Sequence, residues 1–307
     1  MENGPSIYAS TRRMRLRRRI VACAGTILLF VGLIAVVQWW LNVNDFGSTF
    51  EKAGGKYYRT YSQPLIQRTL SAIIGHRSTR NSIRFAPGPV NDQWICQHSE
   101  KLRALSNLQL VLKGTQVTDV GFQELSGCKG LMALDVRRSH LSGQSASVLD
   151  SMTSLYSLNI AYSNIKPADL SPACIGRLIF FSMDASQLDD AGVDALKAVH
   201  GKAGTPFHDF MLYDADKASL ERLLHLNLTF SLRLGGEPVS ADCVPLLVQL
   251  AKQNNLKQLS IDSSKLTREE SLHLRNEIGG CLLQQVPQHH YDSMDERSVP
   301  QSATGLW

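Results

Sequence analysis

Residues 131–165, LMALDVRRSHLSGQSASVLDSMTSLYSLNIAYSNI, contain one short pattern twice. Each copy reads L-x-x-L-x-[VI]-x-x-S-x-[LI], first over Leu131–Leu141 and again over Leu155–Ile165, and a more helical stretch follows it. Two apolar residues at alternating positions, such as Leu134 and Val136, point to the same side of a short strand. One copy cannot bury that side alone, so we expect neighbouring copies to stack against each other.

The same pattern recurs along most of the chain. Its last apolar position returns at intervals of 22 to 29 residues, at Val90, Val117, Leu141, Ile165, Leu188, Val239 and Leu266, with Lys217 in one apolar slot. Such a period is typical of a solenoid of stacked repeats. The longest interval, from Leu188 to Lys217, departs from the rest. The sequence therefore leaves the register of residues 201–217 open and predicts a loop or kink there.

Two phrases of the chain are similar to those of a known repeat family. LKGTQVTD at Leu112–Asp119 and LDDAG at Leu188–Gly192 resemble the repeats of the leucine-rich-repeat family, particularly its bacterial membrane-anchored members. The resemblance covers about residues 80–284. It implies an α/β solenoid, with a curved parallel sheet and helices on the convex side, that presents its sheet to a protein or another ligand.

An apolar segment near the N-terminus predicts one transmembrane helix. Residues 20–41 carry no charge, and at ~1.5 Å per residue they are long enough to cross a hydrocarbon core of ~30 Å. Trp39 and Trp40 stand where an interfacial aromatic belt is expected. The run is longer than a signal-peptide core and ends in bulky residues, which favours an uncleaved anchor over a cleaved signal.

Charge is distributed unevenly, and this predicts the orientation of the anchor. Residues 1–19 hold six arginines and one glutamate, whereas the other 288 residues carry 26 basic and 26 acidic side chains. Under the positive-inside rule, residues 1–19 stay cytoplasmic and the repeat domain is periplasmic or otherwise extracytoplasmic. Because the excess charge sits beside the apolar segment, it does not indicate nucleic-acid binding.

The remaining segments receive simpler interpretations. Residues 42–79 are predicted to be a linker and N-terminal cap, with a short strand pair at 54–61 and a short amphipathic helix at 64–74. Residues 285–307 are polar and proline-containing, which predicts a disordered tail. The cysteines beyond Cys23 form no C-x-x-C pair, so we expect buried packing residues, with one disulfide left open if the domain is exported.

Catalytic signals are weak in this sequence. Asp214-Ala215-Asp216 resembles the Asp-x-Asp pair with which single-anchor glycosyltransferases hold a divalent metal and a sugar nucleotide. The tripeptide, however, occupies the strand-to-turn slot of a repeat. His289-His290 lacks metal-ligand spacing. We therefore predict no cofactor, no metal and no enzymatic activity, with a metal-dependent transferase using Asp214 and Asp216 as the alternative and a purely structural envelope component as a third class.

The functional prediction falls on the residues between the buried positions of each strand, which point to the concave face. One predicted column is Arg84, Val111, Asp135, Asn159, Ser182, Met211, Arg233 and Ser260; its neighbour is Lys113, Arg137, Ala161, Asp184, Tyr213, Gly235 and Asp262. Mixed charge with tyrosine and arginine suits protein recognition. We predict that an unknown protein partner contacts Lys113, Asp135, Arg137, Asn159, Tyr162 at the rim, Asp184, Tyr213, Arg233 and Asp262. An ordinary solvated face is the open alternative.

Overall fold

The computed structural model describes residues 32, 34, 54–61, 79–85, 87–88, 90–203, 207–226, 231–254 and 256–285. The chain divides into two compact units, Met1–Lys52 and Ala53–Trp307, and the features below belong to the second. Within the described ranges no helix is long and apolar enough to cross a membrane. The predicted span at 20–41 lies outside them except for Gly32 and Ile34, as do residues 1–19, the helix expected at 64–74 and the tail after 285.

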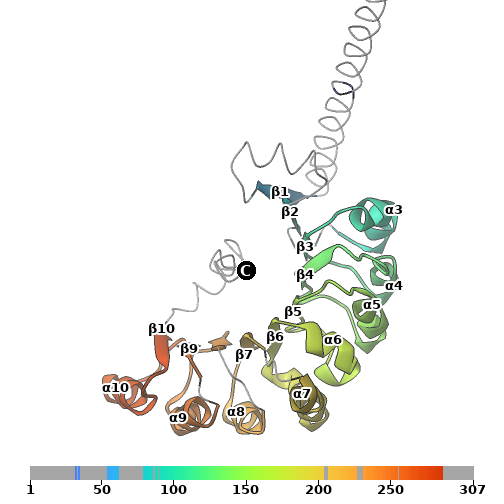
Figure 1. The fold of residues 1–307 in the computed structure, drawn as a ribbon. Helices are drawn as coiled ribbons and strands as arrows, with labels where there is room; N and C mark the ends of the chain where they lie inside the picture. Colours follow the sequence, from blue (N-terminus) through green and yellow to red (C-terminus); the bar gives the residue numbers. More distant parts are fainter. Residues whose placement is uncertain are drawn as a thin grey trace, which may run out of the picture. The chain divides into compact units, whose positions relative to one another are not determined.

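A single sheet runs through the described part of this unit, with its strands in chain order from β1 to β10 (Figure 1). β1 is antiparallel to β2, and every later strand is parallel to its neighbours. The strands are β1 Gly55–Tyr61, β2 Thr79–Phe85, β3 Leu108–Val111, β4 Leu131–Asp135, β5 Ser157–Asn159, β6 Phe180–Asp184, β7 Asp209–Tyr213, β8 Ser231–Gly235, β9 Gln258–Ile261 and β10 Leu282–Gln285.

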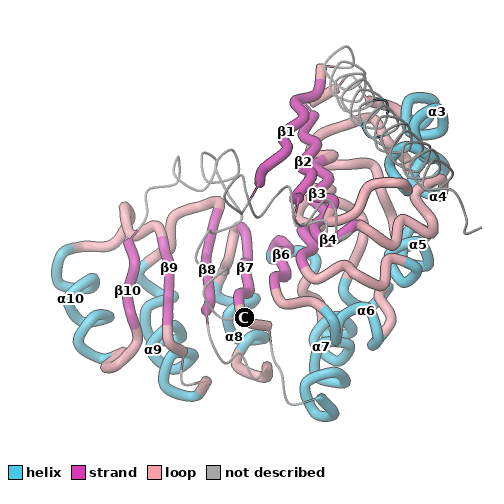
Figure 2. Tube along the Cα trace, turned by 45° about the horizontal axis from the view of Figure 1, so that its top comes forward, coloured by secondary structure: helices cyan, strands magenta, loops and turns pink. Residues whose placement is uncertain are grey.

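A helix connects each parallel strand to the next. The helices are α3 Asp92–Arg103, α4 Asp119–Gln123, α5 Ala146–Ser151, α6 Pro172–Arg177, α7 Asp190–Ala203, α8 Lys217–Leu223, α9 Val244–Gln253 and α10 Arg268–Glu277. They lie along one side of the sheet, and the strands follow an arc with the helices outside it (Figures 1 and 2). The predicted α/β arrangement of a parallel sheet with helices on its convex side is confirmed.

The core sits between the sheet and the helices. The central strand position of successive repeats is occupied by Leu110, Leu134, Leu158, Phe181, Phe210, Leu232 and Leu259, which stand in register across β3 to β9. None of these side chains is more than 2% exposed. Each contributes roughly 1.5–3 kcal/mol by leaving water. This continuous apolar row holds the repeats together.

The long interval between Leu188 and Lys217 does not break the register. Phe207, Phe210 and Leu212 are buried as the pattern requires, and β7 pairs with β6 over its full length. The extra residues lengthen helix α7, which has 14 residues. Lys217 is exposed because α8 begins there, so its slot never enters the core.

The first and last strands depart from the sequence prediction. Residues 54–61 do not form a strand pair of their own; Gly55–Tyr61 is one strand, β1, whose partner is β2. β1 thus covers the first edge of the parallel sheet, and the Tyr57 hydroxyl donates to Asn81 Oδ1 at 2.9 Å. β10, Leu282–Gln285, was not predicted as a strand, because its residues carry only part of the repeat pattern.

Polar contacts between helix starts add to the apolar row. Asp92 accepts hydrogen bonds from the Thr118 backbone N–H at 2.7 Å and hydroxyl at 2.6 Å, one repeat further along. Asp119 accepts the equivalent pair from Ser142 at 2.9 and 2.6 Å. Burial raises the pKa of Asp119, but the bonds from Ser142 and Ser145 outweigh it, so the pKa lies below its ordinary value. Both carboxylates therefore join successive repeats, and the lowered pKa of Asp119 keeps its carboxylate ionised.

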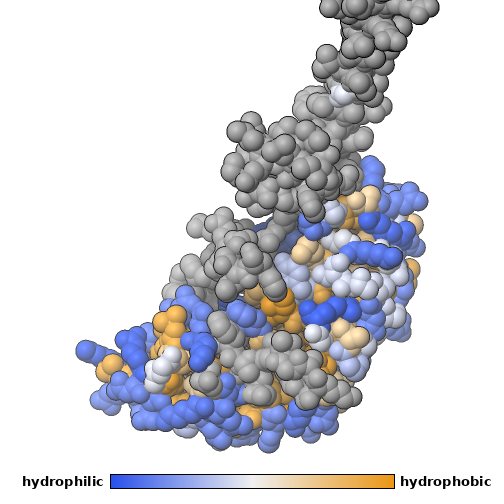
Figure 3. Space-filling model, in the orientation of Figure 1, coloured by the Kyte–Doolittle hydropathy of each residue, from blue (hydrophilic) through white to orange (hydrophobic). Residues whose placement is uncertain are grey.

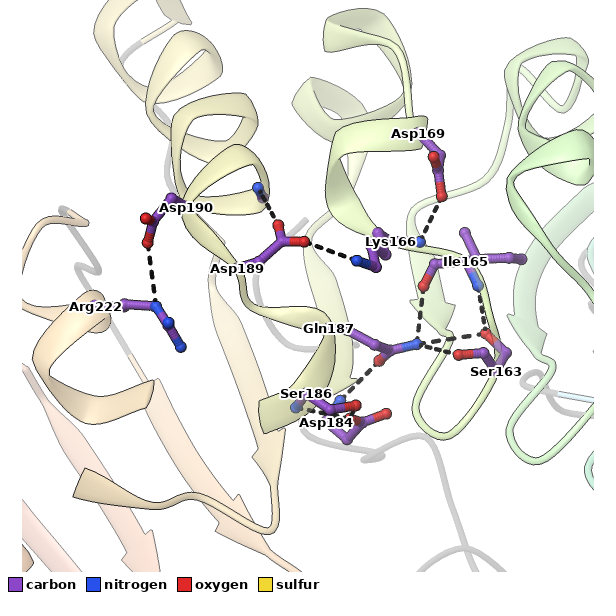
Figure 4. Close-up of polar contacts among 11 residues, drawn as sticks. Ser163, Ile165, Lys166, Asp169, Asp184, Ser186, Gln187, Asp189, Asp190 and Arg222 are labelled. Carbon is purple, nitrogen blue, oxygen red and sulfur yellow. Dashed lines mark hydrogen bonds and ion pairs between the residues drawn. The ribbon is translucent and has the colours of Figure 1, made fainter. Parts of the chain in front are cut away.

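Gln187 joins two repeats inside the protein (Figure 4). Its amide nitrogen lies 2.8, 3.0 and 2.9 Å from the carbonyl oxygens of Ile160, Ser163 and Ile165 in the preceding turn. Its oxygen accepts from the Asp184 backbone N–H at 2.8 Å. The side chain is 3% exposed, so water cannot replace these partners.

We predict that Gln187→Leu lowers the free energy of unfolding by about 2 kcal/mol, because buried carbonyl groups and the Asp184 N–H each lose a hydrogen bond. Urea denaturation monitored by circular dichroism measures the change. Gln116→Leu, at an exposed glutamine of an earlier turn, is the matched control and is expected to leave the midpoint unchanged. Equal midpoints for wild type and Gln187→Leu would show that the buried amide contributes nothing.

Candidate functional site

The predicted central column of the concave face exists as expected. Pairing of the strands places Arg84, Val111, Asp135, Asn159, Ser182, Met211, Arg233 and Ser260 side by side across β2 to β9. All are half-buried except Ser260, which is buried. The column is therefore an accessible strip across the sheet, with the helices behind it.

The second predicted column is largely covered, and here the expectation is corrected. Arg137, Asp184, Tyr213 and Asp262 are 3%, 5%, 5% and 6% exposed, and Ala161 and Gly235 are buried too. Lys113 is half-buried. Strand alternation predicted the direction of these side chains, but long side chains at the strand ends fold over the sheet and contact one another. Whether any of them touches a partner stays a prediction.

Arg137 explains much of this burial. Its Nε and Nη2 donate to both carboxylate oxygens of Asp135, at 3.0 and 2.7 Å. Its Nη1 donates to the Tyr213 hydroxyl at 2.9 Å, which links the turn after β4 to β7. Tyr213 packs so closely on Gly235 that a Cβ there would lie 3.1 Å from its ring. The guanidinium is thus part of the sheet's packing.

Other polar residues of the predicted site also form hydrogen bonds within the protein. Asp184 accepts from the Tyr162 backbone N–H at 2.5 Å and from the Ser186 backbone N–H at 2.9 Å. Asp262 Oδ1 accepts from the Ser264 N–H at 2.9 Å. These carboxylates close the turns that follow the strands, which is a structural role.

A third column, on the other side of the central one, was missed by the sequence reasoning. Ser157, Phe180, Asp209, Ser231 and Gln258 stand in register there. Asp209 forms an ion pair with Arg233 of the central column. Burial raises the pKa of Asp209, and the nearby Arg233 opposes that rise. The alternation that predicted the other two columns could have predicted this one, since each of its residues lies two positions before a residue of the central column.

Hydrophobic side chains come to the surface over β6 and β7, between hydrophilic regions on either side (Figure 3). Phe180 and Met211 are half-buried there, and Phe180 lies 6.1 Å from the ring of Tyr156. Ile179 next to it is 40% exposed. The middle of the sheet therefore offers both polar and apolar groups.

The Asp-x-Asp pair is used for local structure. Asp214 Oδ1 accepts from the Glu237 backbone N–H at 2.9 Å, and Asp216 caps helix α8 by accepting from the Ser219 N–H at 2.8 Å. The bonds from Ser219 lower the pKa of Asp216. In the part of the chain that the structure describes, no three His, Cys, Asp or Glu side chains gather as a metal site would require.

Cysteine positions follow the prediction only in part. Cys128, Cys174 and Cys243 are buried, and Cys281 is half-buried. Burial raises the pKa of Cys128 and of Cys174 to about 11. Cys96, on α3, is exposed, so the expectation that it packs in the core is wrong. All five thiols within the described ranges are free.

Register and burial together define an α/β solenoid of the leucine-rich-repeat type. No protein-family model matches this chain, and no curated protein matches it in sequence. One solved structure that it resembles is an internalin, InlF, from Listeria monocytogenes strain 4b F2365, with 16% sequence identity and a TM-score of 0.30. The match covers 61% of this chain and 63% of that one, less than two thirds of the internalin. A likeness at this level carries no argument about function.

We predict that Arg137→Gln destabilises the domain by about 2 kcal/mol, because it leaves the Asp135 carboxylate, whose side chain is 17% exposed, without its bidentate partner. Urea denaturation of the purified protein measures the loss. Lys252→Gln removes an ion pair with Glu277 in which both side chains are well exposed, and it should have little effect. An equally small effect of Arg137→Gln would argue that the buried pair is dispensable.

Proposed function

We propose that this chain is a non-catalytic binding protein whose repeat domain holds a protein partner on the central column of its concave face. The observation that carries this proposal is the strip of half-buried side chains from Arg84 to Arg233, in register across seven parallel-ordered strands. A regular strip of this kind matches the mixed character of protein interfaces, in which methionine, arginine and aromatic residues are enriched.

The electrostatics of the face favour a protein over a nucleic acid. Asp135 pairs with Arg137 and Asp209 pairs with Arg233, so these acids and bases offset each other on the sheet itself. A polyanion is bound by an excess of basic side chains, which these pairs do not provide. A partner instead gains from desolvating the apolar groups near Phe180 and Met211, where a few buried contacts dominate binding.

We further propose that the predicted helix at 20–41 tethers the domain to a membrane, with residues 1–19 in the cytoplasm and the repeats on the other side. The support is the uncharged 22-residue length of this segment, the six arginines before it and the tryptophans at its end.

Replacing a small residue in the middle of the strip tests the binding face. Ser182 lies between Asn159 and Met211, so Ser182→Arg places a long charged side chain at the centre of the proposed interface. A photocrosslinking amino acid at Asn159 identifies the partner, and purified partner is then titrated. We predict at least a tenfold loss of affinity.

Ala198→Arg introduces the same side chain on an exposed position of α7, on the helical side, and serves as the control with wild-type affinity expected. Circular dichroism verifies that both variants fold. Wild-type affinity in Ser182→Arg would exclude the central column as the binding face.

Thiol labelling tests the orientation. Cys96 is the exposed cysteine among the described residues, whereas the raised pKa of Cys128 and of Cys174 makes them unreactive near neutral pH. A membrane-impermeant maleimide is therefore predicted to label spheroplasts at Cys96, and Cys96→Ser to remove most of that labelling. Labelling that appears only after lysis would place the repeats on the cytoplasmic side and contradict the topology.

A further inference from the structure

The turns after β3, β4, β5, β7 and β8 each contain one residue in the left-handed backbone region, and the middle repeats place unusual residues there. The position lies two residues after the last core residue of the strand. Gly114 and Gly236 occupy it in flanking repeats, with φ of 64° and 76°. Arg138, Tyr162 and Asp214 occupy it in the middle, with φ of 54°, 59° and 50°. Glycine adopts this conformation without steric cost. Arginine and tyrosine pay a steric cost there, because their Cβ atom crowds the backbone.

The side chains at these strained positions contact one another. The guanidinium carbon of Arg138 lies 5.2 Å from the centre of the Tyr162 ring, in a cation–π contact. The Tyr162 ring lies 5.7 Å from that of Tyr213, and its hydroxyl hydrogen-bonds to the Asp214 carboxylate. The Tyr162 backbone N–H donates to Asp184. Tyr162 is therefore fixed from several sides and presents a rigid platform to Arg138.

The charge balance at this rim leaves one cation facing outward. Asp135 is occupied by Arg137, and Asp184 and Asp214 accept hydrogen bonds from backbone N–H groups and from Tyr162. Arg138 is exposed, and no carboxylate of the described residues forms an ion pair with it. An arginine stacked on an aromatic ring keeps its five N–H donors available in a fixed plane.

We propose that Arg138 and Tyr162 form a docking point for an acidic segment of a protein partner. A carboxylate of that segment accepts two parallel hydrogen bonds from the Arg138 guanidinium, and an adjacent apolar side chain packs on Tyr162. The cation–π contact orders Arg138 before binding, so less side-chain freedom is lost when the partner arrives. The inference deepens the proposed function and rests on it, because it names the chemistry that borders the central column.

A model ligand tests this docking point without knowledge of the partner. Fluorescein-labelled hexaglutamate is titrated with the full chain in detergent micelles at low salt, and anisotropy is recorded. We expect saturable binding that weakens at least fivefold in Arg138→Gln and in Tyr162→Leu, and that persists in Tyr162→Phe, which keeps the ring. Lys197→Gln removes one charge from an exposed position of α7 and should bind as wild type does.

Arg138→Gly separates a binding role from a structural one. Glycine relieves the left-handed backbone, so Tm is expected to stay constant or rise while hexaglutamate binding falls as in Arg138→Gln. A clear drop in Tm would mean that Arg138 serves the fold, and would overturn the proposal. So would equal loss in Lys197→Gln, absence of saturable binding, or tighter Arg138-dependent binding of a single-stranded oligonucleotide. The Ser182→Arg experiment is independent of these results, so the two proposals fail separately.

Discussion

Burial of one apolar row holds this protein together. A strand of three to five residues with two inward side chains, followed by a single turn or a few turns of helix, has too little apolar area to fold alone. When the repeats stack, Leu134 packs between its equivalents Leu110 and Leu158 and is 2% exposed. Because every repeat depends on its neighbours, the register across the sheet cannot slip in one place without exposing core residues in the next.

This constraint also determines what the opposite face can do. Side chains that alternate with the core row are arranged in columns by the same register, so their spacing along the sheet is fixed by strand pairing and not by local loops. Whether a side chain in these columns stays accessible depends on its size and charge. Asp135 and Arg137 pair with each other, Tyr213 accepts a hydrogen bond from Arg137, and the short Ser182 leaves its surroundings open. The rigid framework thus supports a face whose accessible part is narrower than the sheet.

The sequence predicted the repeat register well because period and burial are properties of the chain itself. The copy around Phe210, whose register the sequence left open, pairs in register with its neighbours, since the extra residues before it extend α7. It predicted the site less well. The alternation rule gives the direction of Cβ, but it does not say that Arg137 hydrogen-bonds to Tyr213 on β7, or that Asp184 accepts a hydrogen bond from the Tyr162 backbone N–H. Those contacts join residues one to three repeats apart, and no local pattern encodes them. Asp209 belongs to the third column, which has the same period of two as the predicted columns but was not predicted.

The strained turn position carries a different kind of information. Many residue choices in the described repeats agree with local structure, such as Thr118 and Thr267 as helix caps and glycine at two of the left-handed turns. Arg138 and Tyr162 violate that agreement in adjacent repeats. The stacking of Arg138 on Tyr162 offsets part of the steric cost of this backbone conformation, yet glycine would avoid that cost altogether. A local conflict that stability does not require is the expected mark of a functional constraint, and its position at the rim of the accessible column places it where a bound partner would pass.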